Sequence, residues 1–365
     1  MSRRGTPSME DRLRSFPRVR LHFFYNSSPN YHMRRNVGFL ALFACFTLTH
    51  CVLDPTRPFN DVMEYVEDCM EPYLEVCEES EGKVPDDLIF RPSKNASIVE
   101  IGPTDEDGNS RSALTESEMD TLFHLARCLA FIGRIDFEIE TEKDLENYNH
   151  YKKSSGVEMA EDVKEFDDSK LSYSNMTEEA LDEVWNIPFS HFNYDGPGRK
   201  INSQAEEREF GNGVGGNRVV YMHEYLQLIL PELYWKLRDI ASQALQAGKD
   251  AGLFDDDEDH EPISHLGIRV LEYLEYNHKE FGRSSQLGWH RDAESIYTMV
   301  ITLAEPGKDF DGGEFHIKDF DEENVLEFLP SAGCGVFFDS TVDHAVSPLL
   351  RGRRRSFAIE FWDEG

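Results

Sequence analysis

Short runs of β-branched and aromatic residues follow one another from Leu266 to the end of the chain, separated by turn residues. They read LGIRVLEYLEY, SIYTMVITL, GEFHI, VLEFL, GVFFD and RSFAIEFW. Runs of this length with Gly, Pro, Asp and Asn between them are typical of an all-β sandwich or barrel. Their number and length favour a compact jelly roll.

Helical spacing precedes the strand-like runs in three places. Residues 58–80 alternate apolar and acidic positions with a helical period, and Thr115-Glu-Ser-Glu118 is a capping box that predicts a helix through Ala130. Pro231 suits the first turn of a helix, and the apolar positions after it predict a helix over 231–247. We expect this helix to cover one face of the strands.

Polar segments lie between these predicted helices. Residues 81–114 and 193–217 are rich in turn residues and predict loops, and 135–185 is acidic, which predicts an extended excursion or a partly disordered linker. The fold class we expect is α+β, with a C-terminal jelly roll and supporting helices. The expected parts are a basic tail (1–36), a hydrophobic segment (37–53), an acidic helical and loop region (54–218) and the β domain (219–365).

The hydrophobic segment VGFLALFACFTLTHCVL spans Val37 to Leu53 and directly follows a basic tail with eight Arg and two acidic residues. Its length is at the short edge for a membrane-spanning helix, and the flanking positive charge is typical of a targeting signal. A start at Met1 predicts a type II signal anchor, whereas a start at Met33 resembles a cleaved signal peptide. Both place the residues after Asp54 in the endoplasmic reticulum or secretory lumen; a buried core helix is the alternative.

The net charge of the whole chain is −33, and hydrophobic residues make up 39% of it. That hydrophobic fraction is enough for a real core, so the chain is not wholly disordered. The strong acidity argues against nucleic acid as a main partner, because phosphate binding needs clustered Lys and Arg. It carries no information on oligomeric state.

Six cysteines are present, and two of them lie in the hydrophobic segment. Cys128 and Cys334 stand in helical and strand-like patterns, which predicts small core residues. Cys69 and Cys77 are too far apart along one straight helix for a disulfide, but a break at Pro72 would allow a local bridge. Two sequons allow N-glycosylation in an oxidising lumen: Asn95-Ala-Ser and Asn175-Met-Thr.

A His-x-Asp pair stands at the start of a strand-like run. In a strand, residues i and i+2 point to the same side, so His290 and Asp292 can reach one ion from one short segment. His344 follows beside another predicted strand. Two His and one carboxylate form the facial triad of non-haem Fe(II) oxygenases, which leaves positions open for co-substrates. The sequence therefore predicts an iron site made of these three residues.

Arg354 comes ten residues after His344, at the start of the last strand-like run. A keto acid that binds iron through one end needs a partner for its far carboxylate inside a mostly apolar barrel. The planar guanidinium can bind both carboxylate oxygens at once. Since side chains alternate along a strand, Arg354 should face the opposite way from its neighbours Arg353 and Arg355.

Four motifs between about Gly267 and Trp362 resemble the prolyl 4-hydroxylase-like branch of the 2-oxoglutarate- and Fe(II)-dependent dioxygenases. In order, they are GWHRDAESIYTMVITL, DGGEF, GVFFDSTVDHAVSPL and GRRRSFAIEFW. The resemblance implies a double-stranded β-helix, Fe(II), O₂ and 2-oxoglutarate, often with ascorbate as reductant. It also implies hydroxylation of a polypeptide substrate, with a prolyl residue as the candidate target, and release of succinate and CO₂.

The family's iron ligands fall on His290, Asp292 and His344, and its basic 2-oxoglutarate residue falls on Arg354. Many members have Lys at that position, so the Arg leaves the subfamily open. Two further strand residues of the family contact 2-oxoglutarate, and Tyr276 and Thr302 are the nearest matches. Residues 278–286 are an insertion relative to the family, and this insertion affects the alignment of Tyr276 with the family's residue. No residue outside the metal and 2-oxoglutarate sets is expected to be catalytic.

Two other functions remain open at this point. A jelly roll can be a non-catalytic binding module, and loss of a metal ligand or of the arginine would favour that function. The three metal ligands and the arginine are all present here. A cupin-type metal enzyme that does not use 2-oxoglutarate would have no need of Arg354. Release of succinate that depends on 2-oxoglutarate and Fe(II) distinguishes both from the dioxygenase.

Overall fold

The computed structural model describes nine stretches of the chain, all within one compact unit that runs from His50 to Gly365. They are residues 59–79, 82–103, 111–136, 176–186, 200–202, 217–254, 262–281, 285–292 and 295–363. The hydrophobic segment 37–53 and most of the excursion predicted over 135–185 lie outside them. Within these stretches, no helix has both the length and the apolar composition needed to cross a membrane.

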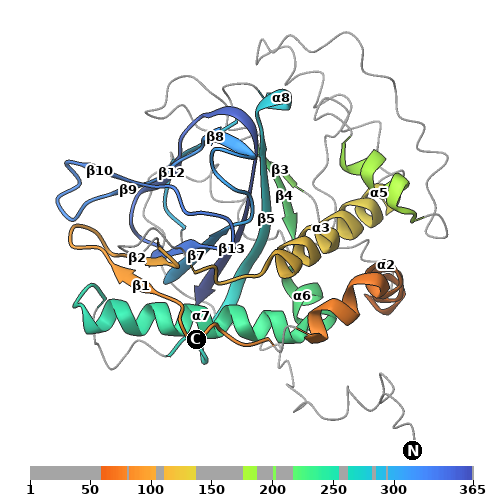
Figure 1. Cartoon of the computed structure of the whole chain (residues 1–365), viewed down its shortest axis with the longest axis horizontal. Coiled ribbons are helices and arrows are strands. Elements are labelled where there is room, and N and C mark those ends of the chain that lie inside the picture. The colour runs from red at the N-terminus through yellow and green to blue at the C-terminus, as the bar shows by residue number, and fades with distance from the viewer. Residues whose placement is uncertain are drawn as a thin grey trace, which may run out of the picture. The chain divides into compact units, whose positions relative to one another are not determined.

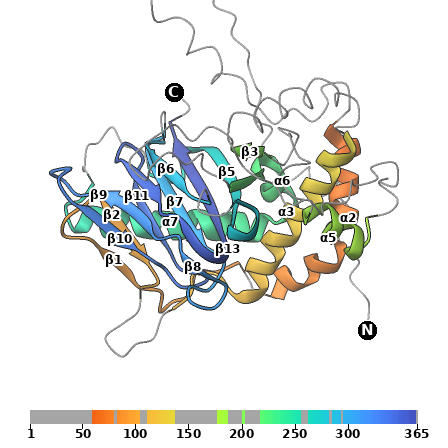
Figure 2. The same ribbon diagram turned by 90° about the horizontal axis from the view of Figure 1, so that it is seen from above.

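Two antiparallel sheets form the β part of the described chain. The larger has the order β1-β2-β11-β7-β13-β5-β4-β3, with β8 paired to β13, and the smaller has the order β10-β9-β12-β6. Figure 2 shows the strands of the two sheets from above. The strands are β1 (Phe90–Pro92), β2 (Ile98–Ile101), β3 (Lys200–Asn202), β4 (Asn217–Tyr221), β5 (Gly267–Asn277), β6 (Leu287–His290), β7 (Tyr297–Thr302), β8 (Phe310–Gly312), β9 (Phe315–Lys318), β10 (Val325–Phe328), β11 (Gly335–Asp339), β12 (His344–Val346) and β13 (Leu349–Trp362).

Helices cover the outer face of the larger sheet (Figure 1). The long helix α7 packs against β1, β2 and β11, and α3 packs against β4 and β5. The predicted jelly roll with supporting helices therefore matches the mixed architecture. The helices are α2 (Phe59–Glu79), α3 (Glu116–Asp136), α5 (Glu178–Trp185), α6 (His223–Ile229), α7 (Pro231–Asp250) and α8 (His278–Phe281).

Two of the predicted helices start where the sequence indicates. Thr115 and Glu118 form the expected reciprocal pair, in which each backbone N–H donates to the other side chain, at 2.8 and 3.2 Å. Helix α3 then continues past Ala130 to Asp136, because Phe131 and Ile132 extend its buried face. Helix α7 begins at Pro231 as predicted and ends three residues later than expected, at Asp250.

Several short elements stand where the sequence predicted loops. Strands β1 and β2 lie within 81–114, β3 lies within 193–217, and α5 closes the acidic segment 135–185. Helix α5 had a local signal, since Thr177 caps it and two glutamates fill its first turn. Strands of three or four residues had no such signal, because they are too short to show a period and depend on the strands beside them for hydrogen bonds.

Two apolar clusters lie on opposite faces of the larger sheet, and β13 contributes to both. Phe357, Ile359 and Phe361 pack with the helices, whereas Ala358 packs in a second cluster with residues of the smaller sheet such as Phe315. Both faces of β13 are therefore covered, as expected for a strand with a helix layer on one side and the sandwich interior on the other.

The cysteines depart from the sequence prediction. Cys128 is not a free core residue: it forms a disulfide with Cys69, with 6.1 Å between the Cα atoms, and the bridge joins α2 to α3. The local bridge between Cys69 and Cys77 is also wrong, because α2 runs unbroken through Pro72 and keeps those positions about 12 Å apart. Cys334 is free and buried, as predicted.

Candidate metal centre

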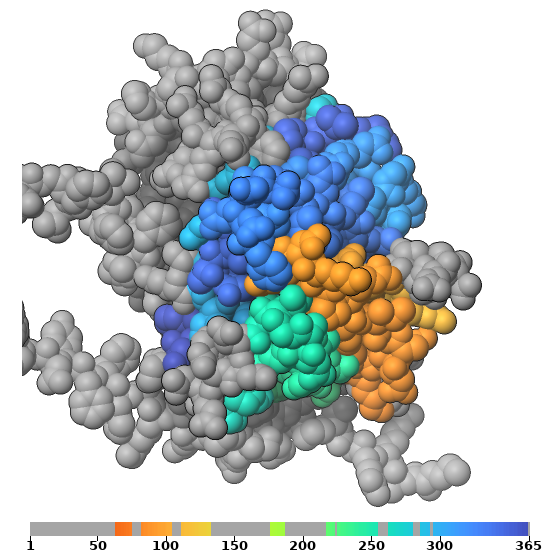
Figure 3. Space-filling view, turned by 90° about the vertical axis from the view of Figure 1, so that its left-hand side faces the viewer, coloured from red at the N-terminus to blue at the C-terminus, as the bar shows by residue number. Residues whose placement is uncertain are grey.

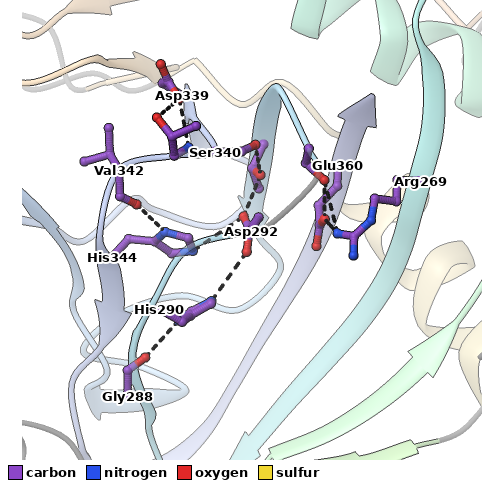
Figure 4. A network of polar contacts seen from close by, with 12 residues as sticks. Arg269, Gly288, His290, Asp292, Asp339, Ser340, Val342, His344 and Glu360 are labelled. Carbon is purple, nitrogen blue, oxygen red and sulfur yellow. Dashed lines mark hydrogen bonds and ion pairs between the residues drawn. The ribbon is translucent and has the colours of Figure 1, made fainter. Parts of the chain in front are cut away.

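The two histidines of the candidate site lie side by side on adjacent strands of the smaller sheet. His290 ends β6 and His344 begins β12, and the two are direct partners in the antiparallel register. Asp292 follows β6 by two residues, so its side chain returns to the same side as His290. Figure 4 shows the three side chains converging from these two segments.

The donor atoms of the three side chains meet at short distances. His290 Nε2 lies 3.6 Å from Asp292 Oδ1, and His344 Nε2 lies 3.6 Å from Asp292 Oδ2. The two imidazole rings are 4.1 Å apart between centroids. Bond lengths of about 2.0–2.2 Å to one metal ion place ligand atoms at such separations. The predicted convergence is therefore confirmed.

Each imidazole is held by a hydrogen bond on the ring nitrogen that points away from Asp292. His290 Nδ1 lies 2.8 Å from the carbonyl of Gly288, and His344 Nδ1 lies 3.0 Å from the carbonyl of Val342. A carbonyl only accepts, so Nδ1 must be the donor, and Nε2 keeps its lone pair. Metal-binding histidines are generally oriented in this way.

Two hydroxyl groups hold the carboxylate, and the sequence did not single them out. Thr298 Oγ1 donates to Asp292 Oδ2 at 2.6 Å and lies 2.8 Å from the hydroxyl of Ser340. The backbone N–H of Asp292 donates to the carbonyl of Ser340 at 3.0 Å. Thr298 had one local signal: it stands on the same face of β7 as Thr302, which the sequence did predict.

The electrostatics of the cluster favour a bound cation. Burial raises the pKa of Asp292 above its usual value and lowers the pKa of His344 to about 4. The imidazole of His344 is therefore neutral, and no Lys or Arg of the described residues contacts the carboxylate of Asp292 directly. Neutral imidazoles and a carboxylate together can bind a divalent ion. The residues present therefore fit the iron that the motif implies.

A second acidic group lies close to the cluster. Glu360 forms an ion pair with Arg269 at 2.6 Å and accepts a hydrogen bond from Ser295 at 2.6 Å (Figure 4). Burial and the charge of Asp292 raise the pKa of Glu360 to about 7. Arg269 compensates the charge of Glu360, so the carboxylate of Asp292 remains the acidic group that faces the two imidazoles.

Arg354 points into the sandwich interior, on the same face of β13 as Ser356. It is 2% exposed, donates to Ser356 Oγ at 3.1 Å, and places its guanidinium carbon 5.2 Å from the centre of the Tyr276 ring. Burial lowers the pKa of Arg354. No carboxylate of the described residues forms an ion pair with it. The carboxylate of Glu314 is close enough to raise the pKa of Arg354 but forms no ion pair with it. A buried guanidinium with no ion-pair partner can bind an anion.

Tyr276 and Thr302 lie around Arg354. Tyr276 is the register partner of Arg354, and Thr302 is the register partner of Ser356. The Tyr276 hydroxyl is buried with no hydrogen-bond partner among the described residues, and burial raises its pKa to about 12, so it stays protonated. A hydroxyl that can donate thus stands beside the buried cation, and Thr302 is also buried.

Arg353 and Arg355 face the helices, as the alternation predicted. Arg355 lies over the ring of Phe123 in α3, 4.2 Å from its centre, and Arg353 donates to Asn186 after α5 at 3.1 Å. Only Arg354 of the three reaches the interior.

A second group of metal-type side chains, Cys69, His124 and Cys128, lies between α2 and α3. Its two sulfur atoms are bonded to each other, so neither is a thiolate ligand.

Residues 271–362 match the sequence profile of a known family, described as the 2OG-Fe(II) oxygenase superfamily. The matched stretch holds every residue of the metal cluster as well as Arg354, Tyr276 and Thr302. This part of the chain is therefore similar to the 2OG-Fe(II) oxygenases, and the similarity implies Fe(II), 2-oxoglutarate and O₂. No curated protein matches the chain.

Solved structures of oxygenases are similar to the chain at low identity. A Pseudomonas putida prolyl-4-hydroxylase shares 22% identity over 41% of this chain and 73% of its own, with a TM-score of 0.29. A Trichoplax adhaerens prolyl hydroxylase in complex with a hypoxia-inducible-factor peptide shares 16% identity over 46% and 70%, with a TM-score of 0.31. Since both TM-scores are below 0.5, the superfamily assignment rests on the sequence profile.

Proposed function

We propose that this chain, whose residues 271–362 match the 2OG-Fe(II) oxygenase superfamily, is a 2-oxoglutarate-dependent dioxygenase that holds Fe(II) with His290, Asp292 and His344. The observation that carries the proposal is the convergence of two oriented imidazoles and one carboxylate at 3.6 Å separations. Three protein ligands leave positions open for the keto acid and O₂.

Arg354 binds the far carboxylate of 2-oxoglutarate in this proposal. Its guanidinium is buried, lacks a carboxylate partner among the described residues and stands on the interior face that also carries Thr298 beside Asp292. The Tyr276 hydroxyl donates a second hydrogen bond, which would satisfy a group that is otherwise buried without a partner. Thr302 is buried on the neighbouring strand β7, opposite Ser356.

With Fe(II) bound by these three residues, the site would supply an O₂-dependent oxidative decarboxylation of 2-oxoglutarate to succinate and CO₂, in which one oxygen atom of O₂ enters succinate and the other hydroxylates the substrate. The protein's own residues orient the reactants and keep water away. The Nδ1–H donors to Gly288 and Val342 fix the imidazole planes, and Thr298 fixes the carboxylate. The apolar cluster around Phe315 and Phe338 excludes bulk water from the ring of His344.

A polypeptide substrate, hydroxylated at a prolyl residue, is the specific activity we propose. The support is the likeness of the motifs to the prolyl 4-hydroxylase-like branch, within which one similar protein was solved with a bound peptide. Ascorbate is the proposed reductant. The proposed location is the endoplasmic reticulum membrane or the secretory lumen, supported by the hydrophobic segment after a basic tail.

The test is succinate release by the purified full-length protein, with a library of proline-containing peptides as substrates. We expect release that requires both Fe(II) and 2-oxoglutarate, rises with a productive peptide and is abolished in Asp292→Ala. Absence of any 2-oxoglutarate-dependent turnover across the library, with iron bound, would support a binding module. Metal-dependent turnover without 2-oxoglutarate would support a cupin-type enzyme instead. Peptide products are identified by mass spectrometry, which separates prolyl hydroxylation from other hydroxylation.

A further inference from the structure

The sequon Asn95-Ala-Ser97 occupies the turn between β1 and β2. Asn95 is exposed, whereas the next residue, Ala96, is 1% exposed and anchors the turn in the interior cluster. Figure 3 shows the part of the chain around β1 and β2, in orange, on the surface between α7 in green and the C-terminal strands in blue. The asparagine therefore projects outward from a turn that is itself held in place.

Both backbone polar groups of Asn95 form hydrogen bonds, whereas its side-chain amide does not. Its N–H donates to Ser93 Oγ at 3.2 Å, and its carbonyl accepts from the N–H of Phe320 at 2.9 Å. The side-chain amide makes no hydrogen bond to a described residue. A bulky group on its nitrogen would leave the turn's hydrogen bonds intact, so the fold can accommodate a modification at this atom.

An independent observation concerns the compartment. The disulfide between Cys69 and Cys128 belongs to the same compact unit as the sequon. Structural disulfides form and persist in oxidising compartments and are rare in the cytosol. N-linked glycosylation occurs in the same lumen that favours disulfides. The bridge thus points to the kind of compartment in which an exposed sequon can be glycosylated.

We propose that Asn95 carries an N-linked oligosaccharide. In this transfer the side-chain nitrogen of Asn95 forms a bond to C1 of the first sugar of a lipid-linked diphosphate oligosaccharide. The C1–O bond to the diphosphate breaks, the lipid diphosphate leaves, and the amide loses one proton to a base. No oxidation or reduction is involved. The proposal rests on the proposed luminal location, and not on the proposed reaction.

The position gives the oligosaccharide a physical role. The neighbouring hairpin turn carries Phe320, whose side chain is 56% exposed, and the backbone hydrogen bond to Asn95 keeps the two residues together. A hydrated oligosaccharide beside this aromatic ring would shield apolar surface that otherwise favours association between molecules.

The test uses the full-length protein expressed in eukaryotic cells, with gel mobility compared before and after treatment with a peptide N-glycosidase. We expect a mobility shift in the wild type, and loss of one glycan in both Asn95→Gln and Ser97→Ala. Ser97→Thr is the matched control, since it keeps the sequon while altering the same residue. After enzymatic release, Asn95 should appear as aspartate in peptide mass spectrometry.

Variants of two other sequons show which asparagine carries the glycan. Asn175→Gln reports on the second luminal sequon, and Asn26→Gln on the sequon Asn26-Ser-Ser28 in the basic tail, which should stay unmodified on the cytosolic side. The proposal is overturned if Asn95→Gln and Ser97→Ala migrate like the wild type under both conditions, or if only Asn26 or Asn175 accounts for the shift. Succinate release by the deglycosylated protein measures the proposed reaction separately.

Discussion

At the scale of single residues, a hydrogen bond holds the carboxylate of Asp292 in place. Thr298 Oγ1 donates to Oδ2 at 2.6 Å and is itself in contact with Ser340. A carboxylate with one oxygen engaged in this way presents the other oxygen in a fixed direction. Partners of this kind commonly change metal affinity by about 10–100-fold when they are removed.

Replacing Thr298 by valine tests this role, because valine keeps the shape and removes the hydroxyl. We expect Thr298→Val to bind Mn(II), used as an oxygen-stable substitute for Fe(II), about 10–100-fold more weakly. The measurement is calorimetric titration of the metal-free protein. Thr298→Ser keeps the hydroxyl and is the control. Equal affinity in Thr298→Val and the wild type would mean that the hydrogen bond does not position Asp292.

His344 should make the stability of the metal-free protein depend on pH. Its pKa falls to about 4 on burial, from an ordinary value of 6.5. Below pH 6.5 the unfolded chain therefore binds a proton that the folded ring excludes. The free energy of unfolding should fall between pH 6.5 and 4, by about 3 kcal/mol at most, and this contribution should be constant above pH 7.

Denaturant unfolding of the metal-free protein at several pH values checks this expectation against His344→Gln. The variant lacks the titrating ring, so its stability should fall less over the same range. Parallel pH profiles for the wild type and His344→Gln would rule out the depressed pKa of this ring as the cause.

At the scale of elements, the alternation of side chains along β13 decides which arginine faces the interior. Arg354 lies opposite Tyr276 in the sandwich, while Arg353 and Arg355 contact α5 and α3 on the other side. A one-residue shift of register would exchange these roles.

Arg354→Ala should weaken 2-oxoglutarate binding by roughly 3–5 kcal/mol, because the buried carboxylate loses its cationic partner. Arg353→Ala is the matched control and should leave the affinity unchanged, since that side chain faces the helices. The apparent affinity is obtained from succinate release at varied 2-oxoglutarate. If the loss instead follows Arg353→Ala or Arg355→Ala, the interior assignment of Arg354 is wrong.

The turn from β8 to β9 supports the same arginine. A Cβ atom at Gly313 would lie 2.9 Å from Arg354 Cδ and 2.8 Å from Leu349 Cδ1, and the φ of Gly313 is +70°. Gly307 has a similar φ of +78° but no atom near its Cβ position. The two glycines thus share the backbone cost of substitution, roughly 1–2 kcal/mol, but only one contacts the arginine.

We therefore expect Gly313→Ala and Gly307→Ala to lose similar thermal stability from the backbone alone, with a further loss for Gly313→Ala. Only Gly313→Ala should weaken the apparent affinity for 2-oxoglutarate, since the added methyl group displaces the Arg354 side chain. Thermal unfolding and succinate release give the two quantities. An equal effect of both substitutions on 2-oxoglutarate affinity would contradict the contact.

At the scale of the whole described unit, the helices and the strands form one structure. Residues from α2, α3 and α7 share a single apolar cluster with β5, β7 and β13. The Cys69–Cys128 bridge closes a loop between residues 59 positions apart and ties α2 to this assembly. Such a crosslink restricts the unfolded chain and so stabilises the folded one.

Removing the bridge should lower the free energy of unfolding by about 2–4 kcal/mol. We expect this for the double substitution Cys69→Ser with Cys128→Ser, measured by denaturant unfolding. Dithiothreitol should destabilise the wild type and leave the double variant unaffected, which separates the disulfide from the change of side chain. Wild-type protein that contains only free thiols in a secretory host would disprove the pairing.

The sequence by itself determined the features whose physics is local. The strand runs, the cap of α3, the proline that starts α7 and the side alternation of β13 depend on neighbours in the chain. Periodicity and helix-start rules therefore predicted them. The pair His290 and Asp292 also follows from local geometry. His344 and Arg354 were predicted by the order of the motifs, and the structure brings them to the interior where the function needs them.

Only the tertiary structure decided the contacts that join distant segments. The pairing of Cys69 with Cys128 depends on how α2 packs against α3. The hydrogen bonds that link Ser340 and Thr298 to Asp292 depend on the pairing of β7 with β11. Strand β2 likewise pairs with β11, far along the chain, and β3 pairs with β4 across a long loop. Contacts made by packing leave no periodic pattern in the sequence of either segment. The hydrophobic spacing and capping residues of each segment are the same whichever distant segment packs against it.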